Sequence, residues 1–385
     1  MTERAQTASS QHGTLTFALG FGTWDDATAG GSFSSDRLVQ FLAADSGPRR
    51  LLVVDAMRNP LVRLRPERGM TFPASEGRDH LRPMRLRRSD PVDYSAAIAE
   101  QRRLLTTAHT RLTRRGWMRS SLLVCNPLAA AAASAGDWDR VTYYGWDDWA
   151  SHPAYAQWWP AFNMAYSAMQ RSGHQIVGVS QRILDKIDTS GDAIVVPNGV
   201  VEAEWHNLIP APQWFLALPR PRFLYSGTVD SRIDIPAIRA LAQAYPESSL
   251  TVMGTIADRD VAAGLAGLAN VYVKDWQPRE VVRGVTATCD VALVPHLRND
   301  LTLAMSPLKL YEYLAAGRPV VARDLPPIAA VDGTLLYSSP QGFVDRVGKA
   351  LEVGPMPEAD RRQFVKSHGW NARFSTLLDF ALGGS

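Results

Sequence analysis

The feature that most constrains the fold of this sequence is the alternation, in its second half, of short strand-like runs with amphipathic stretches. The runs are rich in β-branched residues and read RFLYSGTV, SLTVMGT, NVYVKDW, DVALVPH, RPVVARD and GTLLYS. Helix-like stretches such as IPAIRALAQAY and PREVVRGVTATC separate the earlier runs. Strands that alternate with helices are typical of a parallel sheet covered by helices. The second half is therefore predicted to be a doubly wound α/β domain, which binds ligands beyond the carboxyl ends of its strands.

The first half shows the same order less regularly. The strand-like run TLTFALGFG is followed by a Gly- and Ser-rich stretch, a helix-like segment DRLVQFLAA and a second strand-like run RRLLVVDA. The length of 385 residues exceeds what one hydrophobic core usually serves, and a Pro-Asn-Gly turn suits a crossover between domains. We expect an α/β chain with a Rossmann-like domain over residues 1–190, a second over residues 191–360, and a helical segment over residues 361–385 that packs back on the first.

Composition excludes a membrane-spanning protein. Hydrophobic residues make up 46% and charged residues 21% of the chain, which is ordinary for a globular protein. No apolar run approaches the roughly 20 residues that a spanning helix needs. The N-terminal stretch MTERAQTASSQHG lacks the apolar core of a secretory signal, so we expect a cytoplasmic protein.

Arginines are concentrated in one part of the first half, with few acids among them. Such a surface attracts phosphates or anionic lipid headgroups, which predicts peripheral association with the inner face of the membrane. A solvated variable loop is the alternative. Nucleic acid is not an expected partner, because exposed aromatics are not interleaved there and no nucleic-acid module is recognised. This arginine cluster consists of Arg49, Arg50, Arg58, Arg63, Arg65, Arg68, Arg78, Arg82, Arg85, Arg87 and Arg88.

The segment SPLKLYEYLAAGRPVV gives the strongest chemical signal. Ser306 is a good N-cap, Pro307 suits the first helical position, and Gly317 can end the helix. Lys309 then falls in the first turn, where free backbone N–H groups and the helix dipole already attract anions. Together these groups would hold a diphosphate, and Glu312, one turn on, would accept hydrogen bonds from ribose or sugar hydroxyls. The alternative is a weak surface pair between Lys309 and Glu312.

This segment resembles the donor-site signature of bacterial GT-B glycosyltransferases of group one, in particular the teichuronic-acid and exopolysaccharide branch. In that family a P-x-K-x-x-E-Y segment precedes a G-x-P-V-V strand. Other family-like pieces, VGVSQRIL, VVPNGV, FLYSGTVDSRID, DVALVPH and HGW, occur in the expected order. The resemblance implies two Rossmann-like domains facing across a cleft, with Lys309 on the donor phosphates and Glu312 on the ribose. The matching residues are Pro307, Lys309, Glu312, Tyr313, Gly317, Pro319, Val320 and Val321.

One position departs from the family pattern. Many group-one enzymes have paired glutamates with seven residues between them, the first of which touches the transferred sugar. Here that position is Ala304. The resemblance therefore leaves open whether the transfer retains or inverts configuration.

Further donor-site candidates follow the ends of predicted strands. Gly227 and Thr228 end one strand, where a glycine lets the backbone approach a ligand. Arg232 either reaches a phosphate or faces solvent from a tight turn. Trp276 either offers a platform for the nucleobase or is a packing residue. His296 also ends a strand at the ligand edge, although a lone histidine is more often structural.

Two acidic pairs in the first half compete for the role of catalytic base. Asp25 and Asp26 follow the first strand in GFGTWDD, whereas Asp147 and Asp148 follow another in YYGWDDW, which resembles an element of the same bacterial branch. Adjacent carboxylates can raise the pKa of one member, which suits a base. Helix capping or a loop turn is the alternative at each site. We expect Asp148 to be the base, with Asp25 as the second candidate.

The predicted reaction needs neither a metal nor a cofactor. No group of His, Cys and Asp has metal-ligand spacing, and no D-x-D element ends a suitable strand. We expect transfer of a hexosyl group from a nucleotide-diphosphate sugar to a saccharide, lipid-linked or polysaccharide acceptor. The alternatives are transfer to a small natural product, a GT-B-fold sugar-nucleotide epimerase, and a non-catalytic protein that binds carbohydrate or nucleotide.

Overall fold

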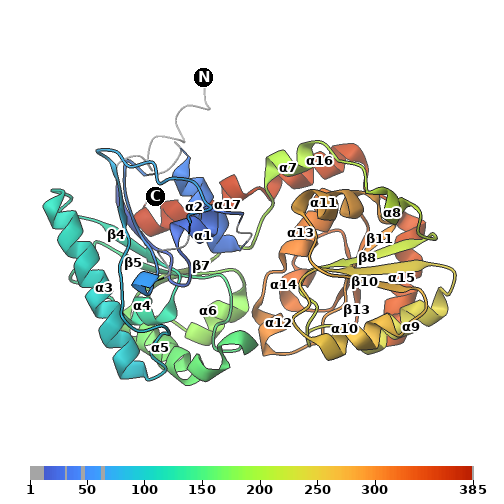
Figure 1. Cartoon of the computed structure of the whole chain (residues 1–385), viewed down its shortest axis with the longest axis horizontal. Coiled ribbons are helices and arrows are strands. Elements are labelled where there is room, and N and C mark those ends of the chain that lie inside the picture. The colour runs from blue at the N-terminus through green and yellow to red at the C-terminus, as the bar shows by residue number, and fades with distance from the viewer. Residues whose placement is uncertain (1–12, 31–32, 45–47, 62–65, 384–385) are drawn as a thin grey trace. The chain divides into compact units, whose positions relative to one another are not determined.

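The computed structural model describes residues 13–30, 33–44, 48–61 and 66–383. Two compact units are present (Figure 1). The first consists of Met1–Pro197 with Asn371–Ser385, and the second of Asn198–Trp370. The chain thus passes into the second unit after residue 197, compared with the expected 190.

The predicted C-terminal helical segment is divided between the units. Helix α16 (Glu358–Ser367) packs against helices of the second unit. Helix α17 (Trp370–Leu382) falls almost entirely in the first unit, where the ring of Phe374 lies 5.6 Å from that of Phe41.

The first unit is built on a parallel sheet of seven strands in the order β3-β2-β1-β4-β5-β6-β7. The strands are β1 (Thr14–Ala18), β2 (Arg50–Val54), β3 (Arg78–Leu81), β4 (Ser121–Val124), β5 (Val141–Gly145), β6 (Gln175–Gly178) and β7 (Ala193–Val195). Every residue of β4 and β5 is buried, which explains why these runs are mostly apolar rather than alternating. The helices are α1 (Trp24–Thr28), α2 (Ser34–Ala43), α3 (Tyr94–Arg114), α4 (Pro127–Ala132), the 3-10 helix η3 (Pro153–Trp158), α5 (Trp159–Ser172) and α6 (Gln181–Ile187).

The second unit contains a parallel sheet of six strands in the order β10-β9-β8-β11-β12-β13. The six runs predicted in the second half each form one of them: β8 (Arg222–Ser226), β9 (Ser249–Met253), β10 (Val271–Lys274), β11 (Val291–Val294), β12 (Val320–Arg323) and β13 (Thr334–Tyr337). Successive side chains of β8 enter opposite apolar layers, because Leu224 packs in one and Phe223 and Tyr225 in the other.

Helices cover both faces of this sheet. One layer is formed by α7 (Glu202–His206), α8 (Gln213–Leu216), α11 (Arg279–Thr288), α13 (Leu308–Ala315), α14 (Pro326–Ala329) and α16. The other is formed by α9 (Ile235–Ala244), α10 (Arg259–Ala266) and α15 (Pro340–Val353), and the short α12 (Asp300–Ala304) follows β11. In each unit the strand order reverses once, between β1 and β4 and between β8 and β11. Ligands of doubly wound sheets bind at these reversal points.

Candidate functional site

Helix α13 begins one residue later than predicted. Pro307 occupies the N-cap position without a side-chain cap, and Ser306 lies outside the helix. Ser306 instead contacts a distant part of the same chain, because its Oγ accepts a hydrogen bond from the backbone N–H of Asn198 at 3.2 Å. The predicted end is confirmed, since Gly317 has a φ of 70° just beyond the helix. Lys309 therefore still lies in the first turn of the helix, although the predicted capping residue was wrong.

Lys309 extends from this first turn into the interior of the second unit. Its Nζ lies 3.9 Å from the centre of the Tyr225 ring and 3.4 Å from Nε2 of His296. Burial, followed by the neighbouring Arg232 guanidinium, lowers the pKa of Lys309 well below its ordinary value. No carboxylate of the described residues lies within ion-pair distance of Nζ. An ammonium group in these surroundings would be stabilised by an added anion.

The loop after β8 adds a second cation to this region. Nη2 of Arg232 lies 2.7 Å from Oδ2 of Asp230, and the arginine side chain is only 22% exposed. The alternative of a solvent-facing arginine is therefore wrong. The same loop pairs with His296, whose ring is fully buried. Burial, then Lys309 and Arg232, lowers the pKa of His296 well below its ordinary value, which keeps the imidazole neutral.

Two glycines bring the backbone close to Lys309. Gly227 follows β8 with a φ of 146°, and Gly254 follows β9 with a φ of 142°. A Cβ atom on Gly227 would stand 2.4 Å from Nζ of Lys309, and one on Gly254 would stand 2.2 Å from the carbonyl oxygen of Gly227. Thr228 completes the turn, with its carbonyl accepting a hydrogen bond from the Tyr225 hydroxyl at 2.9 Å. The absence of side chains at these two positions thus lets the backbone approach the ammonium group closely.

Glu312 pairs with an arginine that the sequence did not single out. Its Oε1 lies 2.6 Å from Nη1 of Arg279, whose Nη2 lies 2.5 Å from Oε2 of Glu204. The guanidinium also lies over the Trp205 ring at 5.9 Å. The alternative of a surface pair between Lys309 and Glu312 is therefore wrong. Arg279 begins α11, three residues after Trp276, so the signal available was a cation at the start of a helix next to a predicted ligand loop.

Trp276 lies in the loop after β10 with 66% of its surface exposed. The alternative of an ordinary packing residue is therefore wrong. Its backbone N–H donates to the side chain of Asp275 at 2.7 Å, which fixes the turn. An exposed indole beyond a strand end offers a flat apolar face to a planar ring.

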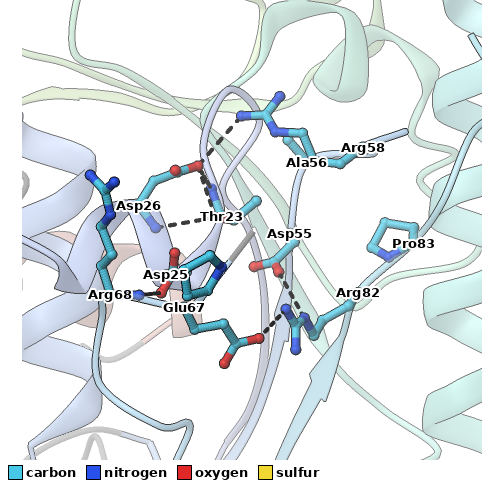
Figure 2. Close-up of a pocket in the computed structure, with 11 residues that line it drawn as sticks. Thr23, Asp25, Asp26, Asp55, Ala56, Arg58, Glu67, Arg68, Arg82 and Pro83 are labelled. Atoms are coloured by element: carbon cyan, nitrogen blue, oxygen red, sulfur yellow. Dashed lines mark hydrogen bonds and ion pairs between the residues drawn. The ribbon is translucent and has the colours of Figure 1, made fainter. Parts of the chain in front are cut away.

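The first unit contains an open pocket of about 330 Å³ beyond the carboxyl ends of β1, β2 and β3 (Figure 2). Four carboxylates and three guanidinium groups meet there, a mixture that suits polyhydroxylated ligands because both charges form hydrogen bonds with hydroxyls. The lining residues are Thr23, Asp25, Asp26, Asp55, Ala56, Arg58, Pro66, Glu67, Arg68, Arg82 and Pro83.

Asp25 and Asp26 have different surroundings in this pocket. Oδ1 of Asp25 accepts hydrogen bonds from the backbone N–H groups of Arg68 at 2.8 Å and Gly69 at 2.7 Å. The other oxygen has no partner among the described residues. Asp26 caps α1 instead, because its Oδ2 accepts from the backbone N–H of Thr23 at 3.0 Å and lies 3.5 Å from Nη2 of Arg58. The capping alternative thus holds for Asp26, and each aspartate keeps one side-chain oxygen, Oδ2 of Asp25 and Oδ1 of Asp26, without a partner among the described residues.

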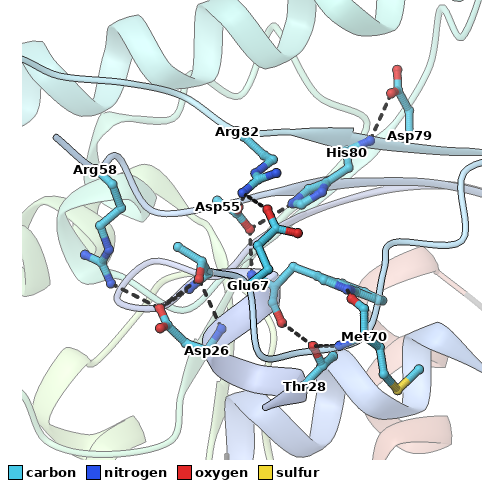
Figure 3. Close-up of polar contacts among 11 residues, drawn as sticks. Asp26, Thr28, Asp55, Arg58, Glu67, Met70, Asp79, His80 and Arg82 are labelled. Atoms are coloured by element: carbon cyan, nitrogen blue, oxygen red, sulfur yellow. Dashed lines mark hydrogen bonds and ion pairs between the residues drawn. The ribbon is translucent and has the colours of Figure 1, made fainter. Parts of the chain in front are cut away.

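The remaining pocket carboxylates are held by contacts between distant parts of the chain (Figure 3). Asp55 is 4% exposed, accepts a hydrogen bond from the backbone N–H of Trp24 at 2.8 Å, and has Nε2 of His80 at 3.0 Å from its Oδ1. Glu67 pairs with Nη2 of Arg82 at 2.5 Å. These contacts join β2, β3 and the loop before β3 into one wall.

Comparison with known proteins now identifies the second unit. Residues 220–352, from β8 to α15, match the family model described as "Glycosyl transferases group 1". The second unit carries a group 1 glycosyltransferase domain. The predicted resemblance is thus confirmed, and Gly227, Arg232, Lys309 and Glu312 all lie within the matched residues of this domain.

A curated relative supports the same family. The chain is 26% identical over 166 residues to the protein named teichuronic acid biosynthesis glycosyltransferase TuaH, from Bacillus subtilis (strain 168). This alignment spans 40% of the chain and 42% of the relative, less than half of either protein.

Solved structures extend the likeness in fold to both units. Sucrose-phosphate synthase from Thermosynechococcus elongatus has a TM-score of 0.69 at 16% identity, covering 97% of this chain and 100% of that one. The UDP-forming α,α-trehalose-phosphate synthase from Burkholderia xenovorans, in complex with glucose-6-phosphate, has a TM-score of 0.66 at 14% identity, covering 96% and 100%. The prediction of a GT-B fold with two Rossmann-like units is confirmed.

The surroundings of Asp148 argue against its predicted role as base. Its side chain is 2% exposed, and its Oδ2 accepts hydrogen bonds from Oγ of Ser151 at 2.5 Å and Nζ of Lys186 at 2.6 Å. Oδ1 accepts from the backbone N–H of Ala150 at 3.2 Å. A carboxylate that is enclosed and already bonded in this way ties the loop after β5 to α6. The alternative of a loop turn describes Asp148 better.

The arginine cluster does not form one basic surface. Arg50 and Arg78 begin β2 and β3, whereas Arg58 and Arg82 follow their carboxyl ends, so the two pairs lie at opposite edges of the sheet. Arg78 donates to the carbonyl groups of Leu42, Ala43 and Ala44 at the end of α2.

The other members of the arginine cluster also differ from one another in exposure and in ion pairing. Arg85 is 8% exposed and pairs with Asp90 and Glu100. Arg63 and Arg65 lie outside the described residues. Arg87 and Arg88 are exposed, and no described residue pairs with either guanidinium group. The basic surface at the carboxyl edge is therefore smaller than the sequence predicted.

The described part of the chain contains neither a candidate membrane-spanning helix nor a candidate metal site. None of its helices combines the length and apolar character that a membrane span requires. Within the same residues, no group of three or more His, Cys, Asp and Glu side chains is arranged to hold a metal ion.

Proposed function

We propose that the chain transfers a glycosyl group from a nucleotide-diphosphate sugar, bound by the second unit, to a saccharide or lipid-linked acceptor bound by the first. The observation that carries this proposal is Lys309. Its ammonium group lies in the first turn of α13, beside the side-chain-free Gly227, with no carboxylate of the described residues in ion-pair distance. A group 1 glycosyltransferase domain surrounds it.

The chemistry follows from charge. When the bond between the sugar and the diphosphate breaks, negative charge grows on the leaving phosphate oxygens. Lys309, Arg232 and the free N–H groups of α13 would stabilise that charge without a metal ion. Glu312, oriented by Arg279, would accept hydrogen bonds from the ribose, and Trp276 would stack on the base. These residue roles are proposals supported by the positions of the side chains.

On the acceptor side we propose that Asp25 is the base that accepts the proton of the acceptor's reacting hydroxyl. Its Oδ1 is held by two backbone N–H groups, so its second oxygen is free to accept the hydrogen bond or proton of the attacking hydroxyl. The guanidinium groups that line the same pocket would bind further hydroxyl or anionic groups of the acceptor.

The first donor to test is UDP-glucose. One solved relative is named for the formation of UDP, and another is described as bound with UDP-2-fluoro glucose. A thermal-shift series with UDP-, GDP- and dTDP-sugars would identify the base, because a ligand that binds only the folded state raises its apparent stability. A hexosyltransferase would release nucleoside diphosphate only when an acceptor is present, whereas an epimerase would convert the donor without one.

Lys309→Ala tests the donor site. Loss of one charge-assisted contact worth about 1.5–3 kcal/mol weakens nucleotide affinity by roughly 10- to 150-fold. Lys349→Ala is the matched control, because Lys349 lies exposed on α15 and pairs with Glu352. Isothermal calorimetry with the nucleoside diphosphate measures both variants. Unchanged affinity in Lys309→Ala would show that the diphosphate binds elsewhere.

A further inference from the structure

The rim of the acceptor pocket exposes three apolar side chains. Leu86 is 89% exposed, Leu61 62% and Met84 57%. Their backbones lie close together, because Asn59 Nδ2 donates to the carbonyl of Leu86 at 2.6 Å and Asn59 Oδ1 accepts from the N–H of Leu61 at 3.0 Å. A β-bridge pairs Arg58 with Met84 in the same place. Single exposed apolar residues are ordinary, whereas a group on two adjoining loop segments indicates a contact surface.

Two unpaired cations adjoin these side chains. Arg87 and Arg88 are exposed, and no described residue pairs with either of them. The run from Met84 to Arg88 reads MRLRR and contains no acid. The nearest acid along the chain, Asp90, is already engaged by Arg85. We call Leu61, Met84, Leu86, Arg87 and Arg88 the docking patch.

We propose that the docking patch binds an anionic lipid bilayer and thereby presents the acceptor pocket to a lipid-linked acceptor. This inference rests on the proposed function, whose acceptor it specifies. Apolar side chains beside unpaired cations match the interface of a bilayer, where the former enter the acyl boundary and the latter meet anionic headgroups. The patch is continuous with the pocket, because Arg82 and Pro83 line the pocket and directly precede Met84, and Arg58, which also lines it, pairs with Met84 in a β-bridge.

Other partners fit the docking patch less well. A nucleic-acid surface would include exposed aromatic side chains for stacking, and the patch has none. An acidic protein partner would form ion pairs with the two arginines but would leave the highly exposed Leu86 without an apolar partner. A bilayer accounts for both kinds of side chain at once.

Sedimentation of the full chain with vesicles tests the inference. We expect binding to vesicles of phosphatidylcholine with phosphatidylglycerol, weaker binding at high salt, and little binding to phosphatidylcholine alone. Leu86→Asp should reduce binding at least tenfold, while Met118→Asp, at another highly exposed apolar site of the first unit, should not. Arg87→Ser with Arg88→Ser should weaken binding on the order of tenfold or more. The matched control is Arg102→Ser with Arg103→Ser, an exposed adjacent pair on α3.

Three outcomes would overturn the inference. The first is equal vesicle binding by Leu86→Asp and the natural chain, and the second is equal loss in Met118→Asp. The third is a self-association of the chain, seen by size-exclusion chromatography, that Leu86→Asp abolishes without any change in lipid binding. Nucleotide affinity measured on the same variants separates this inference from the proposed function, because the patch lies outside the unit that binds the donor. If vesicle binding fails while nucleotide binding persists, the membrane inference is rejected and the proposed function is not.

Discussion

Replacing Asp148 by asparagine separates a structural carboxylate from a catalytic one. The natural side chain is 2% exposed, and one of its oxygens accepts hydrogen bonds from both Ser151 and Lys186. An asparagine has the same shape but carries no charge. If the amide nitrogen of the asparagine faces Lys186 and Ser151, it cannot accept the hydrogen bonds that these two groups donate. If the amide oxygen faces them, it can accept those hydrogen bonds, but the ion pair with Lys186 is still lost. We therefore expect Asp148→Asn to destabilise the first unit.

The size of this effect follows from the contacts. Breaking a fully buried ion pair costs about 3–5 kcal/mol. The Lys186 side chain is 28% exposed and can turn to water, which favours the lower end, about 3 kcal/mol. For a unit of about 200 residues, 1 kcal/mol shifts the Tm by roughly 2–4 °C, so a decrease of about 6–12 °C is expected.

Calorimetry and turnover measured on the same samples decide between the two roles. Lys186→Met should cause a decrease of similar size, and the double variant should cost less than the sum, because both substitutions remove one shared pair. Asp25→Asn should give the opposite result, with nearly natural stability and a large loss of turnover, because an asparagine Oδ1 can keep both backbone hydrogen bonds. An Asp148→Asn protein with natural Tm and turnover reduced more than about 100-fold would refute this reasoning.

Two further predictions concern a glycine and a buried carboxylate. Gly227→Ala should destabilise the second unit by about 1–3 kcal/mol, because the backbone φ of 146° disfavours a side chain. It should also lower nucleotide affinity, because the new Cβ would collide with Lys309. An unchanged affinity, measured by isothermal calorimetry, would contradict the position of Gly227 beside the bound nucleotide. For Asp79, burial raises the pKa, but hydrogen bonds from Arg111 and Arg115 outweigh it and lower the pKa to about 2. Its contribution is thus present above pH ~4 and lost as the pH falls towards 2, so urea unfolding of Asp79→Asn should show a flatter acid limb.

The sequence was sufficient to predict the sheets and the donor helix, because both depend on local patterns. A strand buried on both faces is mostly apolar along its length, and the predicted runs that form β8, β9 and β11 are buried throughout. Gly317 marked the end of α13 because few other residues adopt a positive φ without strain. The start was predicted one residue early, since Ser306 hydrogen-bonds to Asn198 across a long sequence separation instead of capping.

The charged contacts were less predictable, because they join residues far apart in the chain. Nothing in YYGWDDW reveals that Lys186 reaches Asp148, and nothing near Glu312 reveals Arg279. The arginine cluster was overestimated for the same reason. Consecutive arginines in a parallel sheet can lie at opposite edges, and Arg78 is used to bind the last carbonyl groups of α2.

Hydrogen bonds already made within the protein decide which acids of the first unit remain available for chemistry. Asp26 caps a helix, Asp55 is buried against a backbone N–H, and Asp148 holds a lysine. Asp148 would have to give up a structural contact to accept a proton from a substrate, because both of its oxygens accept hydrogen bonds, whereas the close contacts of Asp26 and Asp55 each use one oxygen. Asp25, which lines the pocket, would not, because both of its side-chain contacts use Oδ1 and are made by backbone N–H groups. The fold thus favours the second of the two candidate bases, for a reason that depends on partners and not on the acidic pair itself.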